Sequence, residues 1–270
     1  MSGHTLQDRV AVITGASSGI GRATAVRLAG CGMALVVGAR RETRLAELAE
    51  ELADRHGKRV HALPLDVRDA ASVADFARAA RAAAGAQGVA VLVNNAGLAR
   101  GVTHLPAAGP EDEADWEAVL DTNVMGLLRT TRAFVPDMVA RGRGHVVNLG
   151  SLAGVETYEG GAVYCASKAA VRVLSRGLRL ELLGSGVRVT CVNPGLVAET
   201  EFSRVRLGDD ERAASVYAGM TPLTADDVAR AIAWAVSQPE HVGVEEVLLQ
   251  PTDQAAAQKV HRRSPGPSAA

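Results

Sequence analysis

The sequence predicts a single α/β domain built on a doubly wound parallel sheet of about seven strands. Short apolar runs rich in β-branched residues alternate with amphipathic helical patterns along the 270 residues. Strands without polar alternation need cover on both faces, and a helix between consecutive strands gives parallel pairing with right-handed crossovers. A glycine-rich turn follows the first apolar run, where folds of this class begin their first helix. These three observations together predict the architecture.

The predicted elements follow one another in a regular order. The first strand is expected over 8–14, and the first helix over 21–32 follows a glycine-rich loop. Further strands are expected over 33–39, 58–67, 89–97, 144–150, 187–194 and 245–251. Helical patterns occupy 42–57, 72–85, about 113–140 and 162–184. We therefore expect one domain over 1–250.

Two segments depart from this order. The stretch over about 195–224 is irregular and follows the end of a strand, where open α/β sheets bind their ligands. It is a candidate lid over a substrate. The tail over 251–270 is rich in Pro, Ser and Ala, and it is expected to be partly flexible.

Composition argues against several function classes. The 29 Lys and Arg residues nearly balance the 30 Asp and Glu residues without forming a basic block, so no nucleic-acid partner is expected. No apolar run approaches a bilayer span and the N-terminal stretch lacks the pattern of a secretion signal, so a cytoplasmic protein without a membrane partner is expected. Cys31, Cys165 and Cys191 are widely spaced without CxxC or clustered His, so neither disulfides nor a metal site is expected.

The glycine-rich loop over 14–21 reads TGASSGIG and joins the first strand to the first helix. Its glycines allow a tight turn and let backbone N–H groups approach a pyrophosphate at the helix N-terminus, as in Rossmann-like folds. The simpler alternative is an ordinary strand-to-helix turn, but the alternating elements that follow favour a dinucleotide. The expected cofactor contacts are Gly15, Ser17, Ser18, Gly19, Ile20 and Gly21.

The end of the second strand predicts which dinucleotide binds. An NAD site usually offers a carboxylate there for the ribose hydroxyls, whereas residues 35–41 read LVVGARR. A carboxylate would repel the additional phosphate of NADP, and a guanidinium can hold that phosphate through bidentate hydrogen bonds. Arg40 is the predicted phosphate ligand, with Arg41 in support and Ser17 adding a hydroxyl, so the expected cofactor is NADP(H). The alternative is two solvated arginines at a helix start.

Tyr164 and Lys168 form a YxxxK pattern inside a predicted helix, which places phenol and ammonium on one face. A free tyrosine titrates near pH 10, and a nearby cation favours the phenolate and lowers the pKa toward the working range. Taken alone, the spacing is more typical of a surface pair, and the other motifs reverse that reading. Ser151 ends another predicted strand and is placed to hydrogen-bond the same substrate oxygen, unless it only caps the next segment.

Five ordered motifs over roughly 6–250 resemble the short-chain dehydrogenase/reductase family. They are the loop over 14–21, NNAG over 94–97, Ser151, the YxxxK pattern and NPG over 193–195. The resemblance implies that Asn123 holds a water that relays protons to Lys168, which completes a catalytic tetrad of Asn123, Ser151, Tyr164 and Lys168.

The same resemblance implies further cofactor contacts. They are Asp66 with Val67 near the adenine, Asn94, Ala96 and Gly97 along the groove, Tyr164 and Lys168 at the nicotinamide ribose, and Pro194, Gly195 and Val197 beside the nicotinamide. The family pattern PGxVxT would place Thr at 199, but this loop carries one extra residue and the carboxamide contact moves to Thr200. Family members pair through two long helices, here about 113–140 and 162–184, so a homotetramer or homodimer is implied.

A closer resemblance involves PGLVAETEFSRVRLGDD, GGAVYCASKAAVR and the ending around KVHRR. These segments are similar to NADP-dependent 3-hydroxy acid dehydrogenases acting on serine or allo-threonine, and to clavulanate dehydrogenases. Such substrates carry a carboxylate, for which Arg206 is the candidate ligand beside Ser151 and Tyr164, although a solvated loop arginine is an equal alternative.

The predicted function is NADP(H)-dependent interconversion of an alcohol with a ketone or aldehyde, with a small 3-hydroxy acid as one substrate class. A ketoreductase or semialdehyde reductase of a secondary-metabolite pathway is the alternative within enzymes. A non-catalytic NADP-binding regulator or scaffold is the alternative from another class, and loss of Ser151, Tyr164 or Lys168 would have favoured it.

Overall fold

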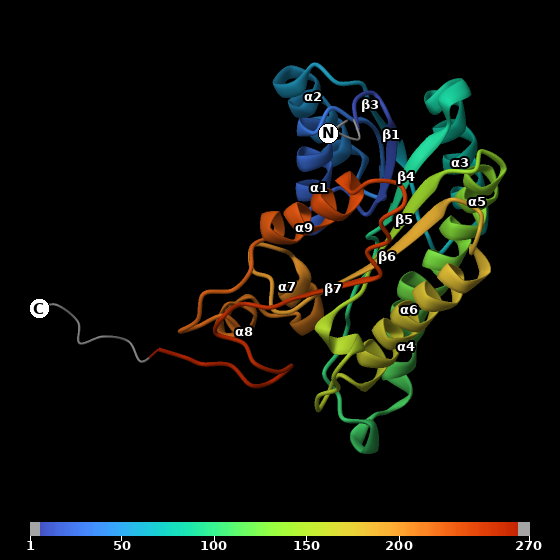
Figure 1. Ribbon diagram of the computed structural model, residues 1–270. Helices are drawn as coiled ribbons and strands as arrows, with labels where there is room; N and C mark the ends of the chain where they lie inside the picture. Colours follow the sequence, from blue (N-terminus) through green and yellow to red (C-terminus); the bar gives the residue numbers. More distant parts are fainter. Residues whose placement is uncertain (1–5, 264–270) are drawn as a thin grey trace, which may run out of the picture.

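A seven-stranded parallel sheet forms the centre of the computed structural model, which describes residues 6–263 (Figure 1). Its strand order is β3-β2-β1-β4-β5-β6-β7, so the chain first builds outward from β1 in one direction and then returns to build in the other. Ligands of such sheets bind at the carboxyl ends of the strands beside this reversal, which lies between β1 and β4. The predicted doubly wound single-domain fold is confirmed.

The strands and helices lie close to the expected bounds. The strands are β1 (Val10–Thr14), β2 (Ala34–Ala39), β3 (Val60–Pro64), β4 (Val89–Asn94), β5 (Gly144–Leu149), β6 (Val187–Pro194) and β7 (Glu246–Leu249). The helices are α1 (Gly19–Gly30), α2 (Glu42–His56), α3 (Ala70–Ala84), α4 (Pro110–Leu120), α5 (Leu127–Ala140), α6 (Ala162–Glu181), α7 (Phe202–Leu207), α8 (Asp210–Ser215) and α9 (Ala225–Ser237).

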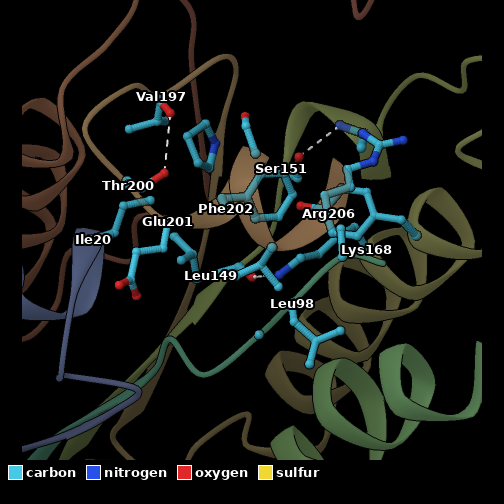
Figure 2. A pocket seen from close by; sticks show the side chains of 18 of the residues that line it. Ile20, Leu98, Leu149, Ser151, Lys168, Val197, Thr200, Glu201, Phe202 and Arg206 are labelled. Carbon is cyan, nitrogen blue, oxygen red and sulfur yellow. Dashed lines mark hydrogen bonds between the residues drawn. The ribbon is translucent and has the colours of Figure 1, made fainter. Parts of the chain in front are cut away.

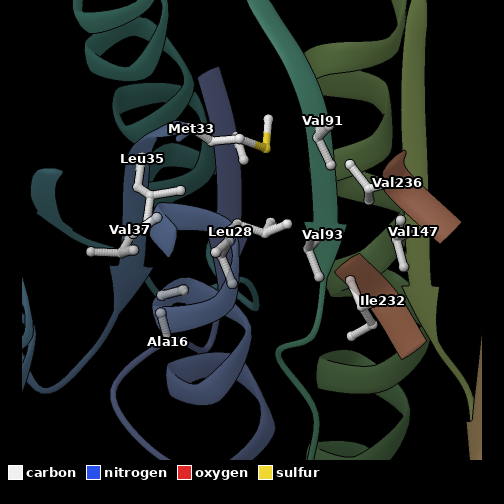
Figure 3. Packing of buried hydrophobic residues seen from close by; sticks show 14 of the residues in the cluster. Ala16, Leu28, Met33, Leu35, Val37, Val91, Val93, Val147, Ile232 and Val236 are labelled. Atoms are coloured by element: carbon white, nitrogen blue, oxygen red, sulfur yellow. The ribbon is translucent and has the colours of Figure 1, made fainter. Parts of the chain in front are cut away.

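Helices cover both faces of the sheet. On one face α1, α2 and α9 pack over the apolar side chains of the strands, where Leu28 and Ile232 meet Val93 and Val147 (Figure 3). On the other face α3 and α5 meet through the edge-to-face rings of Phe76 and Phe134, whose centroids lie 6.2 Å apart. This two-sided burial explains why the strands lack polar alternation.

The helix expected over about 113–140 is interrupted. Between α4 and α5 lies a π-helical turn, η3 (Asp121–Gly126), and such turns are frequent at functional sites. Gly126 lets this turn approach the segment after β3, because a Cβ there would lie 2.6 Å from the Val67 side chain. The turn carries Asn123, so the interruption falls at a residue that the sequence assigns to the site.

Helix α9 was not expected from the sequence. Thr224 caps its N-terminus through a reciprocal capping box with Asp227, in which the threonine hydroxyl accepts the Asp227 N–H at 3.2 Å. The T-x-x-D spacing before an apolar pattern was a readable signal for this helix. No helix within 6–263 is both long and apolar enough to cross a membrane.

The segment after β7 lies against the lid region (Figure 1). Gln254 is buried and its Oε1 accepts the Leu196 N–H at 2.9 Å, while Arg263 donates to Asp253 at 3.0 Å. The described part of the predicted flexible tail is therefore tied to the body of the protein. The rest of that prediction falls on 264–270, outside the described residues.

Candidate active site

A cavity of about 690 Å³ opens at the carboxyl ends of the strands, between the glycine-rich loop, the start of α6 and the segment around α7 (Figure 2). Most of the residues that the sequence assigns to a site line this one cavity. They are Gly15, Ser17, Ser18, Gly19, Ile20, Arg40, Arg41, Asp66, Val67, Ala96, Gly97, Ser151, Tyr164, Lys168, Pro194, Gly195, Val197, Thr200 and Arg206. Gly21, Asn94 and Asn123 are not among its lining residues.

Tyr164 and Lys168 occupy successive turns at the start of α6, and both are buried. The Lys168 ammonium donates to the Leu149 carbonyl at 2.8 Å, which holds it at the end of β5 (Figure 2). Burial lowers the pKa of Lys168 to about 8. The ammonium can therefore exchange its proton close to neutral pH.

The pKa of Tyr164 differs from the sequence expectation. Burial raises this pKa, and the hydrogen bond with Ser151 together with the charge of Arg206 acts only partly against it. The expected net lowering of this pKa is wrong for this geometry, because desolvation of the phenol outweighs the hydrogen bond with Ser151 and the charge of Arg206. Tyr164 is consequently protonated at neutral pH and suited to donate a proton.

Ser151 lies directly after β5 and begins the short 3₁₀ turn η4 (Leu152–Gly154). Its hydroxyl oxygen accepts the Ala153 N–H at 3.1 Å, and its own N–H donates to Asn193 Oδ1 at 3.1 Å. The capping role and the cavity-facing role are thus compatible, because a hydroxyl that accepts one bond still has a hydrogen to donate.

Asn123 holds chain segments together. Its Nδ2 donates to the Leu98 carbonyl at 2.8 Å and to Ser167 Oγ at 3.0 Å, and its Oδ1 accepts the Leu98 N–H at 2.8 Å. A Cβ on Gly97 would lie 3.2 Å from Asn123 Oδ1 and 3.4 Å from Lys168 Nζ, so the two groups converge on this glycine. Both amide hydrogens are engaged within the protein, which makes the side chain a positioning group.

The glycine-rich loop needs its first glycine. Gly15 has a φ of +68°, and a Cβ there would lie 2.8 Å from Ala96 Cα. Gly21 is a packing residue, because a Cβ there would lie 2.4 Å from Asn95 Nδ2 and from the Gly15 carbonyl. The loop can therefore pass close to a ligand with only backbone in between.

Asn95, and not the Asn94 expected from the sequence, lines the cavity. Asn94 is buried and donates to Thr131 at 3.1 Å and to Asn148 at 2.9 Å, so it ties β4 to α5 and β5. Asn95 lines the cavity and donates to the carbonyls of Thr14 and Gly15. The assignment of Asn94 to the groove is wrong because adjacent residues at a strand end point in opposite directions.

Arg40 and Arg41 line the end of the cavity beside the glycine-rich loop, which we call the nucleotide end, and they have different partners. Arg40 is exposed, and its charge helps to lower the pKa of Asp66, after the larger effect of the Arg68 guanidinium that pairs with this carboxylate at 2.7 Å. Arg41 donates to Ser17 Oγ at 3.1 Å and to Ser18 Oγ at 2.6 Å. Arg41 therefore fastens the start of α2 to the glycine-rich loop.

Glu201 completes this end of the cavity and was missed by the sequence analysis. It precedes α7 and accepts hydrogen bonds from Arg41 at 2.6 Å and from Arg44 at 2.7 Å. Burial acts to raise the pKa of Glu201, but the hydrogen bonds from Arg44, Arg41 and Ser18 lower it to about 2. The carboxylate links the lid segment to α2, a contact that no local pattern signals.

The loop before α7 accommodates its extra residue through Glu199, which has a left-handed φ of +57°. Thr200 then lies beside the glycine-rich loop, since a Cβ on Gly19 would be 3.3 Å from Thr200 Cγ2. Thr200 Oγ1 donates to the Val197 carbonyl at 3.5 Å (Figure 2).

Arg206 lies at the opposite end of the cavity, beside Tyr164. Its Nη1 donates to the Tyr158 hydroxyl at 2.7 Å, and its guanidinium carbon lies 5.0 Å from the Tyr158 ring centroid and 5.9 Å from that of Tyr164. Phe202 closes the same wall, with its ring 5.4 Å from the Tyr164 ring. Tyr158 and Phe202 were not singled out from the sequence, which gives no sign that α7 folds onto α6.

The cavity can therefore hold a long ligand with phosphate at one end, and a small ligand beside a buried tyrosine, a serine and an arginine at the other. Comparison with known proteins agrees with this division. The NADP-dependent 3-hydroxy acid dehydrogenase of Salmonella typhi is 43% identical over 255 residues, which are 94% of this chain and 99% of the relative. Sulfoacetaldehyde reductase 2 of Chromohalobacter salexigens is 47% identical over 248 residues, which are 91% of this chain and 95% of the relative.

A solved structure and a family model also match this chain. The closed form of a serine dehydrogenase complexed with NADP+ superposes with a TM-score of 0.85 and 40% identity, over 94% of this chain and 100% of that one. The family model described as short chain dehydrogenase matches residues 9–210. The chain belongs to the short-chain dehydrogenase/reductase family, as its five motifs predicted.

Proposed function

We propose that the protein is an NADP(H)-dependent oxidoreductase that interconverts a hydroxyl and a carbonyl group on a small anionic substrate. The observation that carries this proposal is the convergence of Tyr164, Ser151 and the buried Lys168 in one cavity with a phosphate-binding loop. The names of the relatives support both the cofactor and the reaction class.

The residues at the nucleotide end fit NADP(H). The glycine-rich loop leads into the N-terminus of α1, whose backbone N–H groups suit the pyrophosphate, and the two residues directly after β2 are Arg40 and Arg41 rather than a carboxylate that would repel a ribose phosphate. Arg40 holds that phosphate and Arg41 supports it. Lys168 has two N–H donors beyond its bond to Leu149, which suit the hydroxyls of the nicotinamide ribose.

The cofactor supplies a hydride to the substrate carbon, or accepts one from it, when it is bound. In the reducing direction Tyr164 donates its phenolic proton to the substrate oxygen, and Ser151 hydrogen-bonds the same oxygen as negative charge develops on it. Lys168, with a pKa of about 8, returns a proton to Tyr164. Asn123 positions the site, because its amide joins the Leu98 carbonyl to the Ser167 hydroxyl of α6.

A direct test is NADPH absorbance loss with a panel of aldehydes and ketones, run against NADP+ reduction with 3-hydroxy acids. Turnover with any member supports an enzyme. Tight NADPH binding without turnover across both arms would favour a cofactor-binding regulator or scaffold instead.

The substrate end of the cavity favours an anion. Arg206 brings its positive charge beside Tyr164. Its hydrogen bonds go to the Tyr158 hydroxyl and the Gly160 carbonyl, which are both neutral. Although Glu159 also lines the cavity, no hydrogen bond among the described residues joins it to this guanidinium. A carboxylate or sulfonate a few bonds from the reacting carbon would pair with this guanidinium while the carbonyl meets Tyr164. The names of the 3-hydroxy acid dehydrogenase and sulfoacetaldehyde reductase relatives agree with such substrates.

Replacing Arg206 with methionine is expected to lower kcat/KM for an anionic aldehyde by roughly 10- to 100-fold, since a charge-assisted hydrogen bond contributes about 1.5–3 kcal/mol. For a neutral aldehyde of the same length, kcat/KM should change little. Arg204→Met, on the same helix, is the matched control, because Arg204 is exposed and pairs with Glu201. Equal losses for both aldehydes would contradict an anion-binding role.

Replacing Arg40 with aspartate is expected to reverse the cofactor preference, with the ratio of kcat/KM for NADPH over NADH falling by about 100-fold or more. The reason is that a cation beside the ribose phosphate becomes an anion. Arg55→Asp in the last turn of α2 is the control, since Arg55 pairs only with the surface residue Glu51 among the described ion pairs. An unchanged ratio in Arg40→Asp would refute the assignment.

We assign the segment over about 195–224 as the substrate lid. It contributes Val197, Phe202, Arg206 and Tyr217 to the cavity wall, and Glu201 joins it to α2. Closure of such a segment would exclude water from the reacting carbonyl.

We also propose a homotetramer or a homodimer that pairs through the long helices. Val173 and Leu180 of α6 are 68% and 75% exposed, and Leu120 and Leu128 near η3 are also exposed, which gives this side an apolar surface. Sedimentation showing only monomer would refute the assembly. The cytoplasmic location stays a prediction, which fractionation of cells would test.

A further inference from the structure

A chain of hydrogen bonds runs beneath the candidate catalytic serine, outside the cavity. The Ser151 N–H donates to Asn193 Oδ1 at 3.1 Å, and Asn193 Nδ2 donates to Glu246 Oε1 at 2.7 Å. Arg172 Nε donates to the same carboxylate oxygen at 2.7 Å. Asn193 is completely buried, so each of its polar atoms needs a partner within the protein.

Glu246 determines which way the Asn193 amide faces. The two ends of an amide have nearly the same shape, but a carboxylate only accepts hydrogen bonds. The Nδ2 end must therefore face Glu246, and this leaves the oxygen for the Ser151 N–H and for the Cys191 thiol at 3.4 Å. With the amide reversed, its NH₂ group would meet the Ser151 N–H while its oxygen met the carboxylate.

The oxygen also lies close to the residue that precedes the serine. A Cβ on Gly150 would lie 1.9 Å from Asn193 Oδ1, so this atom lies directly against the backbone that leads into Ser151. Gly150 is also held by its own N–H, which donates to the Val192 carbonyl at 2.8 Å. A change in the amide orientation is therefore transmitted to the backbone of Ser151.

The chain of bonds also reaches the helix that carries Tyr164 and Lys168. Arg172 follows Lys168 by four residues and Tyr164 by eight, so the three side chains share one stripe of α6. Glu246 opens β7, beside β6. The same four residues thus connect the strand end that holds Ser151 with the helix that holds the phenol.

We propose that Asn193 and Glu246 are positioning residues for the reaction: Glu246 orients the Asn193 amide, and Asn193 fixes the backbone of Ser151 relative to Tyr164. This inference rests on the proposed function, because it requires the Ser151 hydroxyl to contact the reacting carbonyl. Neither residue lines the cavity, so their effect on catalysis is indirect.

The first test separates the acceptor from the charge at position 246. In Glu246→Leu, Asn193 Nδ2 loses its acceptor in a buried site and the amide is free to reverse. We expect kcat to fall by about 10-fold while KM and the Kd for NADPH stay within about twofold. Glu246→Gln keeps an acceptor oxygen for Nδ2, so kcat should return to within about twofold of the wild-type value.

Glu245→Leu is the matched control. Glu245 precedes Glu246 in sequence, and its carboxylate pairs with Arg179 at 2.9 Å on the surface, away from Asn193. Its loss should leave kcat unchanged. A wild-type kcat in Glu246→Leu, or a loss in Glu246→Gln as large as in Glu246→Leu, would overturn the proposal.

A second pair of variants keeps the test decisive if Glu246→Leu folds poorly. Asn193→Asp presents two carboxylates to each other and should lower kcat, whereas adding Glu246→Gln lets the new amide donate to the aspartate and should restore it. Hydrogen exchange at the Ser151 amide gives a readout that does not depend on turnover. Exchange should accelerate in Asn193→Asp and return toward the wild-type rate in the double variant, and no rescue in either measurement would refute the mechanism.

Wild-type enzyme and Ser151→Ala distinguish this inference from the proposed function. If the wild type does not oxidise or reduce any substrate, the proposed function fails. If Ser151→Ala loses turnover while the four variants at 193 and 246 behave as wild type, only the positioning role fails.

Discussion

Replacing Tyr164 with phenylalanine is expected to reduce kcat by about 1,000-fold, within the range that a positioned general acid contributes. The phenol is the proton donor of the proposed reaction, and burial keeps it protonated at neutral pH by raising its pKa. The ring itself packs against Phe202 at 5.4 Å, and phenylalanine preserves this contact. Steady-state kinetics with NADPH would measure the loss, and fluorescence titration should give an unchanged Kd for NADPH.

Tyr158→Phe is the matched control for that variant. Tyr158 lines the same cavity, and its hydroxyl accepts a hydrogen bond from Arg206, so its loss should affect KM for an anionic substrate more than kcat. A Tyr164→Phe enzyme that keeps more than a tenth of the wild-type kcat would remove the tyrosine from the mechanism.

The raised pKa of Tyr164 also predicts opposite pH profiles for the two directions. Reduction needs the protonated phenol, which is present across neutral pH, whereas oxidation needs a base and should accelerate as the pH rises. Lys168, with a pKa of about 8, loses its charge in the same range and should limit the reduction rate above that pH. Equal profiles in both directions would contradict this assignment of the acid.

Replacing Lys168 with methionine is expected to lower kcat by at least about 100-fold. The same replacement is expected to raise the free energy of unfolding at pH 7. The ammonium is buried, and burial lowers its pKa from 10.5 to about 8, so its charge disfavours the folded state. The penalty that corresponds to this shift is on the order of 3 kcal/mol, and the lost bond to the Leu149 carbonyl offsets part of it.

The sign of this effect is testable by pH. Between about pH 8 and 10.5 the unfolded chain binds the lysine proton and the folded chain does not, so the contribution of Lys168 to wild-type stability becomes less unfavourable as the pH rises. Denaturant unfolding should show the stability gap between the methionine variant and the wild type shrinking over this range. A variant that is less stable at pH 7, with a constant gap, would contradict the account.

Local patterns were sufficient for the fold and for the centre of the site. The strands and the YxxxK helix follow from periodicity, and the glycine-rich loop follows from backbone sterics at Gly15. These features depend on residues that are near one another in the chain. The capping box at Thr224 belongs to the same class of signal and would have revealed α9.

Other residues were beyond the reach of the sequence because distant segments bring them together. Glu201 meets Arg41 across 160 positions, and Asn193 meets Glu246 across 53. The direction of the Tyr164 pKa shift depends on burial by Phe202 and its neighbours, which no spacing encodes. The choice between Asn94 and Asn95 depends on the exact end of β4, and strand ends are the least readable part of a sequence pattern.

The segment after β7 gives this enzyme an exchangeable wall. Gln254, Ala257 and Gln258 line the cavity, yet they follow the last strand and belong to no strand of the sheet. Grafting the corresponding stretch from a relative while keeping Gln254, whose Oε1 accepts the Leu196 N–H beside Gly195, would alter which molecules fit. For protein engineering this makes Ala257 and Gln258 positions to diversify.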